Sequence, residues 1–151
     1  MRLVIMTGRS AGGKSSVAAA LAKRLNAVVF STDEVRQELL GKYGYPEKDR
    51  EKVTAAVYGR LFKLAKKALE NGRNVILDGT FWSAALRREA RKLAEGSVLV
   101  LVECGAKERE KRRFKKGLPE AVYEEPEDAD VVVDAGSLTP EECAEKVAAV
   151  L

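Results

Sequence analysis

Residues 8–15 read Gly-Arg-Ser-Ala-Gly-Gly-Lys-Ser, a complete Gly-x-x-x-x-Gly-Lys-Ser phosphate-binding loop. An apolar run at 3–6 precedes this loop as a predicted strand, and a helical pattern over 16–25 follows it. Glycines let the backbone N–H groups of such a loop point at a phosphate chain, and the helix N-terminus adds partial positive charge there. The order of strand, loop and helix therefore favours a nucleotide site over a chance match in a glycine-rich turn.

We expect the whole loop and the serine after it to bind the nucleotide. Lys14 would reach the β- and γ-phosphates of ATP and take part in catalysis, and the Ser15 hydroxyl would bind Mg²⁺. The expected nucleotide-binding residues of this segment are Gly8, Arg9, Ser10, Ala11, Gly12, Gly13, Lys14, Ser15 and Ser16.

Strand and helix patterns alternate along the rest of the chain. Further strands are predicted at 27–30, 74–78, 98–102 and 131–134, and helices at 32–40, 51–70, 83–95, 106–116 and from 140 onwards. An acidic connector at 118–130 precedes the last strand, and we interpret it as a solvated connector and not as a metal site. This alternation predicts an α/β fold with a five-stranded parallel sheet, formed by a single domain over 1–151.

The composition excludes several classes of site and protein. The chain has 151 residues and no histidine, so a Ser–His–Asp triad and any His-ligated metal centre are excluded. No apolar run is long enough to cross a membrane, and the N-terminus lacks the shape of a signal peptide. The two cysteines lack metal-ligand spacing, so we expect a reduced, cytoplasmic setting. A net charge of +4 does not require nucleic acid, and the low content of Asn and Gln is typical of thermophile proteins.

A second group of polar residues follows the second predicted strand. Residues 31–36 read Ser-Thr-Asp-Glu-Val-Arg, and Ser31 and Glu34 have the spacing of a capping box. Asp33 would then lie at the carboxyl edge of the sheet, where ligands gather, with Arg36 one helical turn further on. We interpret Asp33 as the carboxylate that aligns an attacking hydroxyl and Arg36 as a catalytic, phosphate-binding residue. The alternative is a surface ion pair at a helix N-terminus.

Asp78 ends the apolar segment 74–78 in the manner of a Walker B acid. It would lie beside Ser15 and bind Mg²⁺ through water. The next residue is Gly79, so the Asp-Glu pair of many ATP hydrolases is missing. The alternative is an ordinary polar strand end.

A cluster of basic residues over 106–118 predicts a short lid. Cations that close over the phosphates stabilise the charge that shifts during phosphoryl transfer. We expect Arg112 to be catalytic and Arg109 and Arg113 to bind the nucleotide, the alternative being a solvated charged helix.

Aromatic and basic residues also follow Asp78. Trp82 would either stack on a base or sugar or serve in packing. Arg87, Arg88 and Arg91 are expected on the exposed face of the next helix, where they would contact phosphates if the acceptor were a polynucleotide.

Taken with these motifs, the chain resembles the small P-loop kinases of the AAA-family ATPase or predicted kinase group. Their relatives include polynucleotide 5′-hydroxyl kinases, gluconate-type kinases and chloramphenicol phosphotransferases. The resemblance rests on the segments 8–16, 31–36 and 72–81, and on the strand ending Val102-Glu103-Cys104 before the basic helix. The segment Tyr123-Glu124-Glu125-Pro126-Glu127 is similar to adenylylsulfate kinases, which carry an extra acid where this chain has Ser31.

This resemblance implies a P-loop NTPase fold, a three-layer α/β/α sandwich with the sheet order 2-3-1-4-5, and ATP and Mg²⁺ as cofactors. The expected activity is transfer of the γ-phosphoryl group of ATP to a hydroxyl acceptor on a small molecule or nucleotide. A polynucleotide 5′-hydroxyl kinase is the alternative enzyme, so nucleic acid is the less favoured partner. A nucleotide-binding ATPase or switch module is the alternative of another class. No membrane partner is expected.

Overall fold

Helices and strands alternate through the chain in the predicted order. The computed structural model describes residues 1–9, 13–41, 49–105, 107–108, 111 and 123–151. The first half of these residues contains β1 (Leu3–Thr7), α1 (Lys14–Leu25), β2 (Ala27–Ser31), α2 (Thr32–Leu40) and α3 (Arg50–Glu70). The second half contains β3 (Asn74–Asp78), α4 (Ala84–Arg91), β4 (Val98–Glu103), β5 (Val131–Asp134) and α6 (Pro140–Ala148).

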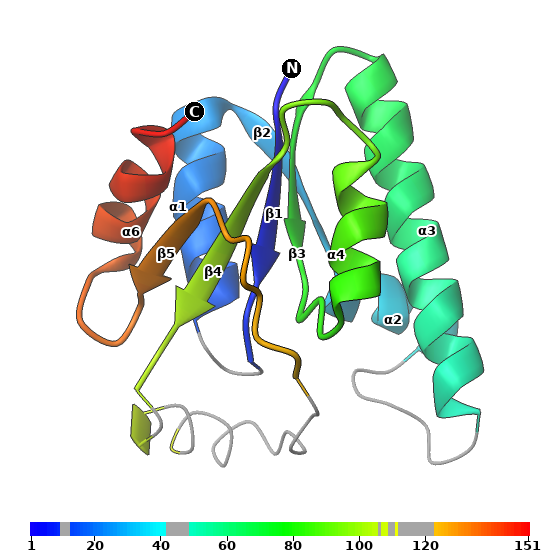
Figure 1. The fold of residues 1–151 in the computed structure, drawn as a ribbon. Coiled ribbons are helices and arrows are strands. Elements are labelled where there is room, and N and C mark those ends of the chain that lie inside the picture. The colour runs from blue at the N-terminus through cyan, green and yellow to red at the C-terminus, as the bar shows by residue number, and fades with distance from the viewer. Residues whose placement is uncertain (10–12, 42–48, 106, 109–110, 112–122) are drawn as a thin grey trace.

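The described strands form one five-stranded parallel sheet in the order β2-β3-β1-β4-β5. This order confirms the one that the resemblance implies. The strand before the phosphate-binding loop is the central one, because Leu3 pairs with Val75 of β3 and Val4 pairs with Val98 of β4. Because the strands are parallel, the carboxyl ends of all five described strands lie at one edge of the sheet, at the lower end of the view in Figure 1. That edge is where parallel sheets bind ligands.

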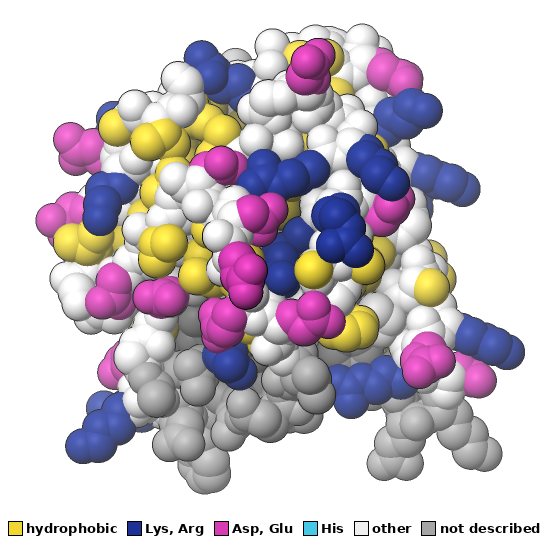
Figure 2. All heavy atoms as spheres, in the orientation of Figure 1, with side chains coloured by type: hydrophobic (Ala, Val, Ile, Leu, Met, Phe, Trp, Pro, Cys, Tyr) yellow, Lys and Arg dark blue, Asp and Glu magenta, His cyan; other side chains and the backbone are white. Residues whose placement is uncertain are grey.

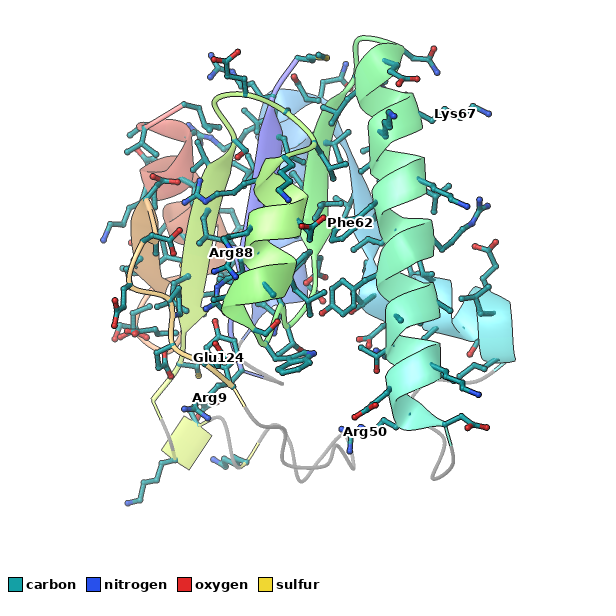
Figure 3. The ribbon with its side chains drawn as sticks, turned by 45° about the vertical axis from the view of Figure 1, so that its right-hand side comes forward. Arg9, Arg50, Phe62, Lys67, Arg88 and Glu124 are labelled. Atoms are coloured by element: carbon teal, nitrogen blue, oxygen red, sulfur yellow. The ribbon has the colours of Figure 1, made fainter. Side chains whose placement is uncertain are left out.

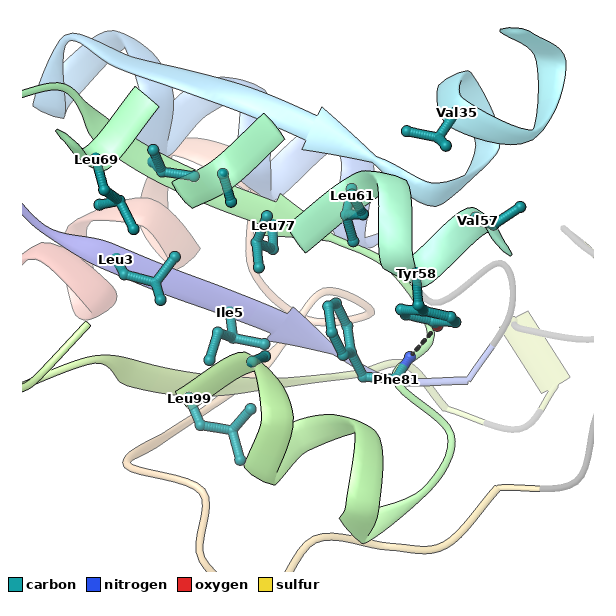
Figure 4. Close-up of a cluster of buried hydrophobic side chains, with 13 residues drawn as sticks. Leu3, Ile5, Val35, Val57, Tyr58, Leu61, Leu69, Leu77, Phe81 and Leu99 are labelled. Carbon is teal, nitrogen blue, oxygen red and sulfur yellow. Dashed lines mark hydrogen bonds between the residues drawn. The ribbon is translucent and has the colours of Figure 1, made fainter. Parts of the chain in front are cut away.

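Helices cover both faces of the sheet, which makes the fold a three-layer sandwich (Figure 1). All five residues of β1 are buried, and successive side chains point to opposite faces. Leu3 and Ile5 belong to a core with residues of α3 and α4, shown in Figure 4. Val4 and Met6 belong to a second core with residues of α1 and α6. The phosphate-binding loop therefore follows a strand fixed from both sides.

Helix caps agree with the sequence, and one helix is shorter than predicted. The Ser31 hydroxyl accepts a bond from the N–H of Glu34 at 3.0 Å, which is one of the two bonds of the predicted capping box. Thr139 and Glu142 form a complete capping box. The prediction of a helix over 83–95 is wrong at its end, since α4 stops at Arg91. Leu93 and Ala94 pack on the α3 and α4 core from a turn, and Gly96 has a φ of 76°. This left-handed glycine redirects the chain into β4. None of the described helices has the length and apolar character of a membrane span.

Candidate active site

The carboxyl edge of the sheet brings together the polar groups that follow β1, β2 and β3. Ser31, the last residue of β2, pairs with Asp78 at the end of β3. The loop after β3 touches the start of α2, because a Cβ atom on Gly79 would lie 2.8 Å from Cγ2 of Thr32. The segment that carries Asp33 and the segment that carries Asp78 are therefore in direct contact.

Ser15 and Asp78 meet as the sequence predicts. The Ser15 hydroxyl donates a hydrogen bond of 2.7 Å to Oδ2 of Asp78. Asp78 is only 6% exposed, and its place is set by the pairing of β3 with β1, in which it lies opposite Met6. A hydroxyl and a carboxylate oxygen are hard oxygen ligands, so this pair fits Mg²⁺.

Lys14 is folded back on the loop that precedes it. Its Nζ donates to the carbonyl oxygens of Gly8 at 3.1 Å and Arg9 at 3.0 Å, and the residue is buried. Helix α1 begins at Lys14, two residues earlier than predicted, after Gly13 in the left-handed region with a φ of 92°. The positive end of the α1 dipole therefore lies within the phosphate-binding motif. Ser10, Ala11 and Gly12 lie outside the described residues.

Gly8 sits too close to β4 for any side chain. A Cβ atom there would collide with the carbonyl oxygen of Val102, which is backbone and cannot turn aside. The loop thus leaves β1 in contact with the neighbouring strand.

We expect Gly8→Ala to lower the free energy of unfolding by about 1–3 kcal/mol through overpacking. The matched control is Gly59→Ala in the exposed interior of α3, where a Cβ atom meets nothing within 4 Å. That change should instead raise stability by about 0.5–1 kcal/mol, since glycine is a poor helix former. Urea denaturation of both variants measures the difference. Equal stability of Gly8→Ala and the wild type would contradict the close packing.

Asp33 and Arg36 form an ion pair on α2. Nη1 of Arg36 donates to Oδ1 of Asp33 at 2.9 Å. The Arg36 side chain is 4% exposed and the Asp33 side chain 67% exposed. A buried guanidinium thus fixes one oxygen of a carboxylate that solvent reaches at the edge of the sheet.

Two of the three arginines predicted as exposed on α4 are not exposed. Arg87 is 3% exposed and donates from Nη1 to the carbonyl oxygen of Phe81 at 2.8 Å. It lies three residues before buried Ala90, so it shares the helix face that packs on the sheet. Arg91 bonds the Ser97 carbonyl and pairs with Asp128 and Asp130. Arg88 alone of the three is exposed, and Figure 3 shows it on α4.

The acidic connector is more than a solvated linker, which corrects the sequence interpretation. Besides the pairs with Arg91, Glu125 forms an ion pair of 3.0 Å with Arg9 of the phosphate-binding loop. The N–H of Glu124 donates to the Trp82 carbonyl at 2.8 Å, and its carboxylate accepts from the N–H of Ala84 at 3.4 Å. Figure 3 shows Arg9 and Glu124 at the same end of the molecule. The connector therefore packs against the site.

Sequence reasoning missed Thr7 and gave Tyr123 no role. The two hydroxyl oxygens are 2.8 Å apart, and Tyr123 is 8% exposed. Tyr123 also lines a cavity of about 250 Å³, together with Arg9, Leu101, Glu103, Glu125 and Asp134, among others. The sequence offered one signal for Tyr123: it is an aromatic residue within the acidic segment 123–127, which is similar to adenylylsulfate kinases. Trp82 is 37% exposed, which leaves its side chain accessible.

The predicted lid lies largely outside the described residues. Of the segment 106–118, the structure describes Lys107, Glu108 and Lys111. Arg109, Arg112 and Arg113 fall in the remainder, so their roles stay predictions. The same holds for the basic helix expected over 106–116.

The AAA domain family matches residues 3–129, which include every described residue of the candidate site. The chain belongs to this family. An uncharacterized protein of Mycobacterium tuberculosis is 35% identical over 68% of the chain, and the chain spans 22% of the length of that protein. A probable adenylyl-sulfate kinase of Pyrococcus abyssi is 30% identical over 94% of the chain and 90% of its own length.

Solved structures support the same fold. The Mycobacterium tuberculosis APS kinase in complex with AMPPNP and APS superposes with a TM-score of 0.78. The alignment covers 99% of this chain and 96% of the APS kinase chain, at 21% identity. Because the identity is low, this likeness concerns the arrangement of the sheet and helices.

Proposed function

We propose that residues 1–151 form a single kinase domain that transfers the γ-phosphoryl group of ATP to a hydroxyl group of a small molecule. One observation carries the proposal. The phosphate-binding loop, the Ser15–Asp78 pair and the Asp33–Arg36 pair occupy one edge of a parallel sheet, at the ends of three adjacent strands. Phosphoryl transfer requires a phosphate-binding loop, an acid that holds the metal ion and a carboxylate that orients the acceptor.

The loop and the Ser15–Asp78 pair form the proposed nucleotide side of the site. When bound, ATP supplies the phosphoryl group, and Mg²⁺ neutralises part of the phosphate charge. Lys14 would exchange its bonds with the Gly8 and Arg9 carbonyls for phosphate oxygens, which are stronger acceptors because they are charged. Ser15 and Asp78 would hold the metal ion.

Asp33 and Arg36 form the proposed acceptor side. The Asp33 carboxylate would accept the hydrogen bond of the attacking hydroxyl and so orient its oxygen. A carboxylate at a helix N-terminus is a weak base, because the helix stabilises its charged form. Orientation suffices when bond breaking runs ahead of attack, as in most analyses of this reaction. Arg36, held on Asp33 at 2.9 Å, would orient the carboxylate and bind phosphate.

A small acceptor is favoured over a polynucleotide by the charges around the site. Arg87 and Arg91 are engaged within the fold and do not form the basic face that an oligonucleotide would need. Figure 2 shows basic and acidic side chains interspersed over the α4 face. This mixture gives little of the sequence-independent phosphate binding on which nucleic-acid affinity depends.

The test is phosphoryl transfer from labelled ATP with Mg²⁺ to a panel of acceptors. Adenylyl sulfate comes first, because it is the acceptor named for the Pyrococcus abyssi relative and because the segment 123–127 resembles such kinases. Sugars, nucleosides, aminoglycosides and oligonucleotides complete the panel. Labelled product from one small acceptor supports the proposal. Hydrolysis of ATP without phosphoryl transfer to any acceptor of the panel supports an ATPase module.

We expect the apparent affinity for the acceptor to change little with salt. A polynucleotide acceptor would instead give a log–log slope of roughly −0.7 for each neutralised phosphate of a single strand. The measurement is KM for the acceptor between low and physiological ionic strength. A slope that corresponds to three or more phosphates would overturn the preference for a small molecule.

A further inference from the structure

Tyr123 connects the acidic connector to the strand that leads into the phosphate-binding loop. Its hydroxyl lies 2.8 Å from Oγ1 of Thr7, the residue directly before Gly8. Thr7 Oγ1 in turn lies 2.7 Å from the carbonyl oxygen of Thr80 in the loop after β3. The pair of hydroxyls is buried, and 116 residues separate the two side chains in the sequence. Three segments of the site thus meet at one hydroxyl.

The direction of these bonds follows from counting hydrogens. A threonine hydroxyl has one hydrogen, and a carbonyl oxygen can only accept, so the Thr7 hydrogen goes to Thr80. The Tyr123 hydroxyl must therefore donate to Thr7. Burial raises the pKa of Tyr123 above its usual value, which keeps the phenol protonated and able to donate throughout the neutral range.

The same connector also holds the side chain of the second loop residue. Nη2 and Nε of Arg9 lie 3.0 Å and 3.2 Å from Oε1 of Glu125. The Arg9 guanidinium lies over the Tyr123 ring, 5.4 Å from its centre, and that of Arg87 lies 5.8 Å from it. Both distances are within the range of attractive cation–π contacts. The Arg9 carbonyl oxygen accepts a hydrogen bond from Nζ of Lys14, so the contacts of the connector with Arg9 are linked to the lysine of the loop.

We propose that Tyr123 is a positioning residue for the phosphate-binding loop, assisted by the Glu125–Arg9 pair. This inference rests on the proposed kinase function and goes beyond it. Tyr123 fixes Thr7, and with it the point at which the backbone leaves β1, while Glu125 fixes Arg9 one residue beyond Gly8. The backbone is then already held in place when nucleotide arrives, and less ordering is needed on binding.

The decisive experiment measures ATP affinity and turnover in Tyr123→Phe, which removes only the hydroxyl. We expect the Kd for ATP to rise roughly three- to tenfold, the worth of one buried hydrogen bond, with kcat at saturating ATP unchanged. Thr7→Val should raise the Kd at least as much, because it also loses the bond to the Thr80 carbonyl, whereas Thr7→Ser should keep wild-type affinity. The Thr7→Val/Tyr123→Phe double variant should bind no more weakly than Thr7→Val alone. Additive losses in the double variant would contradict a shared bond.

Glu125→Gln tests the second contact, with Glu127→Gln as its matched control. Both glutamates are exposed residues of the same connector, but only Glu125 pairs with Arg9 in the described part of the chain. We expect Glu125→Gln to raise the Kd for ATP roughly twofold to fivefold, as for a surface ion pair, and Glu127→Gln to leave it unchanged.

The outcomes separate this inference from the proposed function. A wild-type protein that binds no ATP overturns both. A wild type that binds ATP, with a Tyr123→Phe variant of equal affinity, overturns the positioning role alone. The same holds if Tyr123→Phe melts at a lower temperature but its folded fraction binds ATP as well as the wild type. If Tyr123→Phe does not fold, the contrast between Thr7→Val and Thr7→Ser decides.

Discussion

Lys14→Ala is expected to reduce phosphoryl transfer at least roughly 10³-fold. A cation that stabilises the charge on a transferred phosphoryl group, such as an arginine finger, contributes on the order of 10³–10⁵ in rate. In the structure Nζ of Lys14 donates to two backbone carbonyl oxygens of its own loop, at 3.0 Å and 3.1 Å. Its loss should therefore lower the free energy of unfolding by no more than about 2 kcal/mol. Steady-state kinetics and urea denaturation give the two values.

Lys23→Ala is the matched control, because Lys23 is an exposed lysine in the last turn of the same helix. It removes an equal charge from α1, far from the phosphate-binding loop, and should leave turnover within about twofold of the wild type, since surface charges contribute little. Phosphoryl transfer by Lys14→Ala at the rate of Lys23→Ala would refute the kinase proposal.

Asp33→Asn is expected to slow transfer roughly 10²–10⁴-fold while ATP affinity is largely kept. The change preserves the size of the side chain and removes the charge that aligns the acceptor hydroxyl. Positioned acid–base groups typically raise the reaction rate by a factor of this order. Because Asp33 is 67% exposed, solvent screens its charge and the ion pair adds little to stability. Single-turnover transfer and direct ATP binding separate the two effects.

The control for Asp33 is Glu34→Gln. Glu34 is also an exposed acid in the first turn of α2, so the control removes the same charge from the same helix N-terminus. A helix-dipole role would make both variants lose stability equally, and neither would lose activity per folded molecule. That result would reduce Asp33 to a capping charge.

The sequence predicts the strands of the sheet and the position of the first set of site residues well, while the roles of those residues stay predictions. The apolar runs of β1, β3 and β4 are the buried central strands, and the motif residues Lys14, Ser15 and Asp78 lie where strand ends meet. Local periodicity does not order strands, and the order 2-3-1-4-5 came from the resemblance. The early end of α4 was missed, because periodicity reports neither the turn from which Leu93 packs on the core nor the left-handed conformation of Gly96.

Long-range contacts account for most of what the sequence did not predict. Arg87 was expected at the surface because arginines usually lie there, but its α4 face turns to the sheet. Tyr123 and Thr7 form their bond across 116 residues, so no local spacing reports it. The acidic connector was treated as solvated because its partners, Arg9 and Arg91, lie on other elements.

The central position of β1 has a consequence for folding kinetics. The first strand of the chain receives its neighbours from residues 75–78 and 98–101, so two long loops must close before the sheet forms around it. Closing such loops costs chain entropy before any contact is gained, which slows the folding of parallel sheets. In refolding experiments we expect capacity to bind nucleotide to return in the slowest phase, after most helical signal has recovered.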